Sequence, residues 1–128
     1  MRRLIPSLLL LLLAAPLPAQ EWRTAPEYDV LLTSYAISPR VIHLKAGEPV
    51  RLHFVNNSNV ALSFDSPAFF RSAELRERDA DSIRRGTLSL GPLSDRTIAL
   101  VPRAGRYAAR SRNFIHRLLG MSSRIVVE

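Results

Sequence analysis

The residues of this sequence that could support chemistry include serine, histidine and aspartate, but no cysteine is present. Ser111 and His116 could act as a nucleophile and its base. However, no Gly-x-Ser-x-Gly turn surrounds the serine, and no nearby carboxylate in the sequence could orient the imidazole. The sequence around Asp79 and Asp81 lacks the glycine and the distal glutamate that a calcium-binding loop requires. We therefore expect that the protein is not an enzyme.

Length and composition limit the remaining possibilities. The chain has 128 residues, of which 47% are hydrophobic and 23% charged, which suits one globular domain. The absence of cysteine excludes disulfides, thiolate-bound metals and cysteine nucleophiles. The five glycines are too widely spaced for a phosphate-binding loop.

The first residues have the pattern of a secretory signal peptide. Arg2 and Arg3 precede an apolar run from Leu8 to Ala15, and two prolines follow it. The whole apolar stretch, from Leu4 to Ala19, has 16 residues, fewer than the roughly 20 that a membrane-spanning helix needs. We therefore expect a signal peptide at residues 1–19, cleavage after Ala19 and a periplasmic location.

The charges of the exported part are positive overall but dispersed. After residue 19 the sequence contains 16 basic and 11 acidic residues. Acids and bases alternate from Glu74 to Arg85, which is typical of a solvated surface. A positive exterior favours anionic partners or lipid head groups. Because the protein is expected to be exported, we predict no binding to nucleic acid.

Residues 20–27 are expected to form an N-terminal linker anchored by Trp22, and residues 28–128 to form a single all-β domain. Val50, Leu52 and Phe54 alternate with more polar residues, so one face of that strand should meet a core while His53 points outward. His43 is likewise predicted to face away from the core. Eight segments with strand character predict an antiparallel sandwich or barrel: 29–36, 41–44, 49–55, 59–64, 87–90, 96–101, 106–111 and 123–127.

Two segments have helical rather than strand spacing, namely 67–81 and 113–119. Pro67 can open a short helix that Ser66 would cap, and this helix would place Phe69 and Phe70 against the sandwich. The charged stretch that follows is expected to be a solvated surface excursion between strands.

Residues along most of the exported chain carry a family resemblance. They are Ile42, Gly47, Pro49, Val50, Leu52, Asn56, Phe64, Pro67, Phe70, Gly105, Arg106, Tyr107, His116, Leu119, Gly120, Met121, Ile125, Val126 and Val127. The most specific part is the run from Asn113 to Met121. The sequence resembles the cupredoxins, a plastocyanin- and azurin-like family, in their exported bacterial branch. The resemblance implies a cupredoxin-like Greek-key β-sandwich of about seven to eight strands, with one short helix or surface excursion.

The resemblance also implies a degenerate copper site. Family members that hold type 1 copper use a histidine from the strand after the Asn turn, and a cysteine, a histidine and a methionine from the last loop. His116 and Met121 match two of these ligands, whereas Leu62 and Ser111 stand at the first histidine and the cysteine positions. Leucine has no lone pair, and a hydroxyl cannot replace a soft thiolate. No cofactor is therefore predicted, although His116 and Met121 could still bind copper.

Two functions fit this pattern. We favour a non-redox binding or accessory module in the cell envelope, whose partner is another envelope protein or the membrane surface. In this case Leu62 should pack against Met121 where the metal would be. The alternative is a copper carrier or sensor that binds Cu(I) through His116 and Met121 with an incomplete ligand set. The sequence determines neither the identity of the partner nor the oligomeric state.

Overall fold

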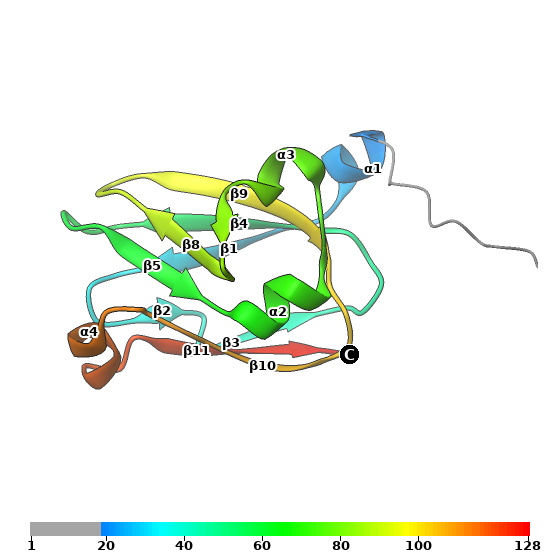
Figure 1. The fold of residues 1–128 in the computed structure, drawn as a ribbon. Helices are drawn as coiled ribbons and strands as arrows, with labels where there is room; N and C mark the ends of the chain where they lie inside the picture. Colours follow the sequence, from blue (N-terminus) through cyan, green and yellow to red (C-terminus); the bar gives the residue numbers. More distant parts are fainter. Residues whose placement is uncertain (1–18) are drawn as a thin grey trace, which may run out of the picture.

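Two β-sheets packed face to face make up residues 19–128, the part of the chain that the computed structural model describes (Figure 1). The first sheet has the order β2 (Ile37–Ser38), β1 (Glu27–Leu32), β4 (Val50–Asn56), β9 (Asp95–Val101) and β6 (Glu74–Leu75). The second has the order β3 (Val41–Leu44), β11 (Ser122–Val127), β10 (Gly105–Arg110), β5 (Leu62–Asp65), β8 (Thr87–Leu90) and β7 (Ile83–Arg84). The predicted signal peptide lies, apart from Ala19, outside the described residues.

The predicted strands and the observed strands agree in number and place. Each of the eight strands of four or more residues overlaps one of the eight predicted segments, although β1 ends four residues earlier and β5 begins three residues later than predicted. The other three strands, β2, β6 and β7, have two residues each, too few to produce a readable alternation in the sequence. The expectation of an all-β sandwich is confirmed.

The core lies between the sheets and is built on aromatic contacts. The burial of β4 alternates along its whole length, as predicted. Phe54 of β4 and Phe64 of β5 meet with ring centroids 4.8 Å apart, so they join the two sheets. Helix α2 (Pro67–Ser72) adds Phe69 and Phe70, which are buried as expected. Ser66 precedes this helix, but its hydroxyl donates to the carbonyl of Ala108 instead of capping the helix.

The prediction of a purely antiparallel arrangement is wrong for two strand pairs. β1 pairs with β4 in parallel, and β3 pairs with β11 in parallel. The chain passes from β1 and β2 in one sheet to β3 in the other and then returns to β4. Because β1 and β4 are not joined by a hairpin, no tight turn requires them to run in opposite directions.

The segment expected as an N-terminal linker is attached to the sandwich. It forms α1 (Ala19–Thr24), and the side chain of Trp22 is buried. The carbonyl of Ala25 accepts a hydrogen bond of 3.0 Å from Nε of Arg51 in β4. No helix among residues 19–128 is both long and apolar enough to cross a membrane.

The charged excursion contains a buried carboxylate in an ion pair, which sequence reasoning missed. Asp79 lies in α3 (Glu77–Ala80) and is buried, although it was predicted to be solvated. Its Oδ2 accepts from Nε of Arg76 at 2.7 Å and from the backbone N–H of Ala99 at 2.9 Å. The carboxylate therefore ties α3 to β9, and it is kept from solvent because both partners satisfy it.

The carboxamide of Asn56, the last residue of β4, connects the two sheets at one end of the molecule. Asn56 is buried, and its Nδ2 contacts the carbonyls of Val60, Leu90 and Gly91 at 2.9, 3.2 and 2.9 Å. Its Oδ1 accepts from the backbone N–H and the hydroxyl of Ser58 at 3.0 and 2.8 Å. One side chain therefore fixes the β4–β5 loop against the end of β8.

We predict that Asn56→Ala lowers the free energy of unfolding by about 2–3 kcal/mol, because buried carbonyls lose their donor. Urea denaturation measures the change. The matched control is Asn57→Ala at the exposed neighbouring position, which should change stability by less than about 0.5 kcal/mol. Equal losses in the two variants would contradict the role assigned to the Asn56 side chain.

Candidate functional site

The residues implied as ligands lie at the end of the sandwich that carries α4 (Phe114–Leu118) (Figure 1). Ser111 directly follows β10, His116 lies in α4, and Met121 directly precedes β11. The backbone N–H of Ser111 donates to the carbonyl of Met121 at 3.2 Å, and that of Met121 donates to the carbonyl of His116 at 3.0 Å. The structure therefore brings these three residues into one hydrogen-bonded loop.

Leu62, the first residue of β5, lies beside this loop. The backbone N–H of Arg112 donates to Oγ of Ser63 at 3.0 Å, which joins the segment after β10 to β5. The side chains of Leu62 and Met121 are 3% and 0% exposed and belong to the same hydrophobic core. The region of Leu62 and Met121 is therefore apolar and closed to solvent.

Ser111 has a structural role at this position. It is 1% exposed, and its Oγ accepts a hydrogen bond of 3.1 Å from the backbone N–H of Asn113. Asn113 in turn caps α4, because its Oδ1 accepts from the N–H groups of Ile115 and His116 at 2.9 and 3.3 Å. These two side chains fix the entry of the chain into α4.

His116 carries an unusual buried atom. Its Nδ1 is shielded from solvent and has no hydrogen-bond partner among the residues that the structure describes. A buried nitrogen without a partner is unfavourable and rare in native proteins, and an ordered water, an ion or another ligand can satisfy it. His116 therefore brings a buried nitrogen without a protein partner into the loop that also carries Met121.

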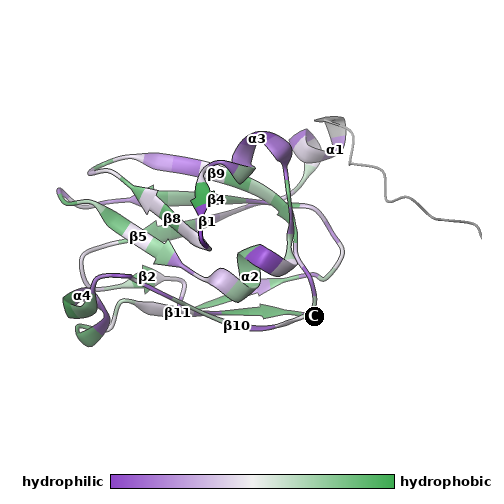
Figure 2. Cartoon of the chain, in the orientation of Figure 1, coloured by the Kyte–Doolittle hydropathy of each residue, from purple (hydrophilic) through white to green (hydrophobic). Residues whose placement is uncertain are grey.

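Sequence reasoning did not predict how strongly α4 exposes its apolar residues. Phe114, Ile115, Leu118 and Leu119 are 63%, 63%, 70% and 52% exposed. Figure 2 shows α4 as a hydrophobic segment on the outside of the sandwich. The spacing of these residues in the sequence predicts an apolar helix face, because residues four apart lie on the same side of a helix. The spacing does not show whether the rest of the fold covers that face.

The other histidines face outward, as predicted from the strand alternation. His43 is exposed on β3. His53 on β4 lies between two carboxylates: Nδ1 is 2.8 Å from Asp29 of β1, and Nε2 is 2.7 Å from Asp95 of β9. These hydrogen bonds, that of Asp95 most strongly, raise the pKa of His53 above its ordinary value of 6.5. Ligand atoms of Glu27, Asp29 and His53 lie within 4.8 Å of one another, but a carboxylate already engages each ring nitrogen.

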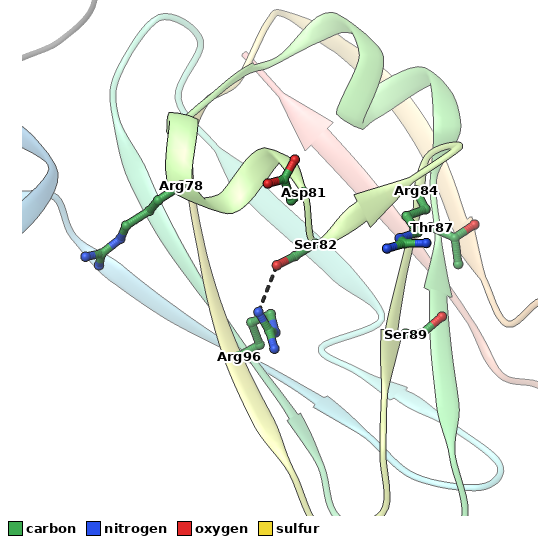
Figure 3. A pocket seen from close by; sticks show the side chains of 7 residues that line it. All are labelled: Arg78, Asp81, Ser82, Arg84, Thr87, Ser89 and Arg96. Carbon is green, nitrogen blue, oxygen red and sulfur yellow. Dashed lines mark hydrogen bonds between the residues drawn. The ribbon is translucent and has the colours of Figure 1, made fainter.

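A polar hollow of about 450 Å³ lies on a different part of the molecule, where α3 meets β7, β8 and β9 (Figure 3). Arg96 spans part of it, because Nη1 donates to Oγ of Ser82 at 2.8 Å. Figure 3 also shows that Arg78 extends away from the other side chains. None of the residues implied as ligands lines this hollow, whose lining consists of Arg78, Asp81, Ser82, Arg84, Thr87, Ser89 and Arg96.

Comparison with solved structures shows that the fold is cupredoxin-like, which confirms the fold implied by the sequence. Auracyanin B is 18% identical with a TM-score of 0.58, over 81% of this chain and 89% of that chain. Auracyanin A, a "blue" copper protein from Chloroflexus aurantiacus, is 17% identical with a TM-score of 0.55, over 81% of this chain and 100% of that chain. No protein-family model and no curated protein matches the sequence.

A multicopper oxidase is also similar in structure. McoA from Aquifex aeolicus is 16% identical with a TM-score of 0.64, and the match covers 89% of this chain but 31% of the oxidase. The chain therefore corresponds to about a third of that enzyme. At these identities the likeness concerns the fold.

The bridge through His53 predicts a pH-dependent stability. The pKa of His53 is raised in the folded protein, so protonation of this histidine stabilises the fold. This stabilisation is fully present below the ordinary pKa of 6.5 and is lost as the pH rises through the pKa of the folded state. We expect His53→Gln to destabilise the protein by on the order of 1 kcal/mol below pH 6.5, and by less at alkaline pH. Urea denaturation from about pH 5 to pH 9 measures this difference. His43→Gln is the control, and a His53 effect that grew with pH would contradict the assignment.

Proposed function

We propose that the protein is an exported, non-redox binding module of the cell envelope, built on a cupredoxin-like scaffold with a degenerate copper site. The observation that carries the proposal is the pair Leu62 and Ser111. Both are buried beside the loop of His116 and Met121, at the positions where the resemblance implies a histidine and a cysteine. Neither residue supplies the ligand that type 1 copper requires.

The donor set does not fit a type 1 copper centre. Such a centre depends on a cysteine thiolate and two imidazoles with a weak axial ligand. This end of the sandwich offers one imidazole, that of His116, one buried thioether and a hydroxyl that already accepts a hydrogen bond from Asn113. We therefore assign no electron transfer through type 1 copper to this protein.

The loop has contacts that can maintain its shape without a metal. The backbone bonds among Ser111, His116 and Met121 close the loop, and Asn113 caps α4. Leu62 and Met121 contribute apolar burial to the core on the inner side of the loop. We propose that these interactions hold this end of the fold in place of bonds to a metal.

Other features support an exported binding protein rather than an enzyme. The N-terminal sequence has the pattern of a signal peptide. The buried Nδ1 of His116 has no hydrogen-bond partner within residues 19–128, so this nitrogen does not activate the hydroxyl of Ser111. The exposed apolar residues of α4 provide a surface for a partner, which is an envelope protein or the membrane.

One observation favours a second candidate function. The unpartnered Nδ1 of His116 lies in the same loop as the Met121 thioether, and both atom types bind Cu(I). A copper carrier or sensor could use these two ligands and receive others from a partner chain or a small molecule. Its ligand set within this chain would remain incomplete.

Metal analysis of the protein purified from the periplasm separates the two candidates. We expect less than a stoichiometric amount of copper, and no saturable uptake when Cu(I) or Cu(II) is titrated under reducing or oxidising conditions. The matched variant is His116→Ala with Met121→Ala. Stoichiometric copper that this double variant no longer binds would overturn the non-redox proposal and support the carrier or sensor.

Restoring the missing ligands tests the residue assignment itself. Leu62→His combined with Ser111→Cys should give a protein that takes up Cu(II) and develops the intense visible absorption of thiolate-bound copper. Ser111→Cys alone is the control and should remain weakly coloured, because it lacks the second imidazole. If the folded double variant, as judged by circular dichroism, stays colourless, then Leu62 and Ser111 are not the positions of the lost ligands.

A further inference from the structure

The α4 end of the sandwich gathers most of the exposed apolar side chains. Nine large apolar side chains are exposed in residues 19–128, and Tyr28 and Val41 lie elsewhere, on β1 and β3. The remaining seven lie in the loops at this end, which we call the apolar end: Tyr35, Val60, Leu93, Phe114, Ile115, Leu118 and Leu119. Monomeric proteins seldom leave such a group uncovered without a use for it.

Hydrogen bonds hold these loops side by side. The backbone N–H of Leu93 donates to the carbonyl of Ser58 at 2.9 Å, which joins the β8–β9 loop to the β4–β5 loop. Gly120 approaches the carbonyl of Tyr35, since a Cβ at Gly120 would lie 3.8 Å from that oxygen. Figure 1 shows α4 at the same end of the sandwich as the β4–β5 and β8–β9 loops. The apolar end thus gathers loops from both sheets at one end of the molecule.

The apolar stripe of α4 has a fixed orientation. Phe114 and Leu118 are four residues apart, as are Ile115 and Leu119, so the two pairs form adjacent rows on one helix face. His116 between them turns its Nδ1 into the protein. Because the Asn113 cap fixes the start of α4, the apolar rows point outward without further rearrangement.

The charges of the apolar end have one sign. Its loops, at residues 33–36, 57–61, 91–94 and 112–120, contain no aspartate or glutamate, and their charged side chains are Arg112 and Arg117. From Arg96 to Val127 the sequence has seven arginines and no acidic residue. The guanidinium of Arg117 lies 5.8 Å from the ring centre of Phe114, next to the apolar stripe. A cation therefore borders the apolar side chains of α4, and the carboxylate that directly follows the loop at 91–94, that of Asp95, is engaged by His53.

We propose that the apolar end inserts into the interfacial region of an anionic lipid bilayer. This inference rests on the proposed binding function and names its partner. Reversible membrane attachment combines apolar insertion with basic residues at the head groups, and the apolar end supplies both. Long arginine side chains can keep their charge at the phosphates while the neighbouring rings enter the acyl boundary.

Vesicle co-sedimentation tests the proposal, and it uses the full-length protein after any N-terminal processing by the host cell. Vesicles of phosphatidylcholine with phosphatidylglycerol should bind the protein, and vesicles of phosphatidylcholine alone should bind it more weakly. Phe114→Ser with Leu118→Ser should reduce binding by about tenfold or more, because the inserted apolar area is lost. Arg112→Gln and Arg117→Gln should each reduce binding to anionic vesicles by about fivefold, and added salt should weaken it.

Matched controls place the same substitutions elsewhere on the surface. Tyr28→Ser with Val41→Ser removes two exposed apolar side chains away from α4, and Arg103→Gln removes a charge in the turn between β9 and β10. These controls should bind like the unchanged protein, and all variants keep the same N-terminus. Thermal unfolding checks that each variant is folded.

Three results would overturn the proposal. These are no binding to anionic vesicles at millimolar lipid, equal binding by the α4 variant, or self-association without lipid that the α4 variant abolishes. The last result would assign the surface to a second copy of the chain. Copper content does not affect vesicle binding, so the two proposals can fail separately. Absence of vesicle binding would overturn membrane insertion but not the non-redox proposal. Copper uptake in the metal analysis would overturn the non-redox proposal but not membrane insertion.

Discussion

The buried carboxamide of Asn56 joins the two sheets at the end of the molecule that carries the candidate site. It stands at the last residue of β4 and contacts carbonyls of the β4–β5 loop and of the end of β8, which belongs to the other sheet. A carboxamide can donate and accept at once, so it satisfies loop backbone groups that the strands cannot reach. The loops it holds carry Val60 and Leu93, two of the exposed apolar side chains at this end. Asn56 therefore fixes the loops that come from β4 and β8, while Asn113 fixes α4.

The same end presents two faces with opposite character. On the inner side, Leu62 and Met121 join the hydrophobic core, and Ser111 and Asn113 use their side chains to hold the loop. On the outer side, the apolar residues of α4 remain uncovered. In this account the scaffold keeps the loop geometry of its fold while apolar packing and hydrogen bonds replace ligand bonds. What the loop offers to other molecules is then its surface rather than a redox centre.

The fold was largely predictable because its determinants are local. Alternation at Val50, Leu52 and Phe54 identifies a half-buried strand without knowledge of its neighbours. The parallel pairing of β1 with β4 follows from crossings between sheets, which no local pattern encodes. The sequence indicated residues such as His116, Asp79 and His53 but not their environments, including the buried, unpartnered Nδ1 of His116. The buried Asp79 and the bridged His53 depend on contacts between segments that are distant in the sequence.

The central claim is that this end of the protein is complete without a metal. The most direct measurement is the melting temperature of the protein as isolated, after treatment with a chelator, and after addition of Cu(I). A ligand that binds only the folded state raises stability in proportion to the logarithm of its concentration over its dissociation constant. The account predicts the same melting temperature in all three conditions. A rise of about 4 °C or more with Cu(I), reversed by the chelator, would contradict it.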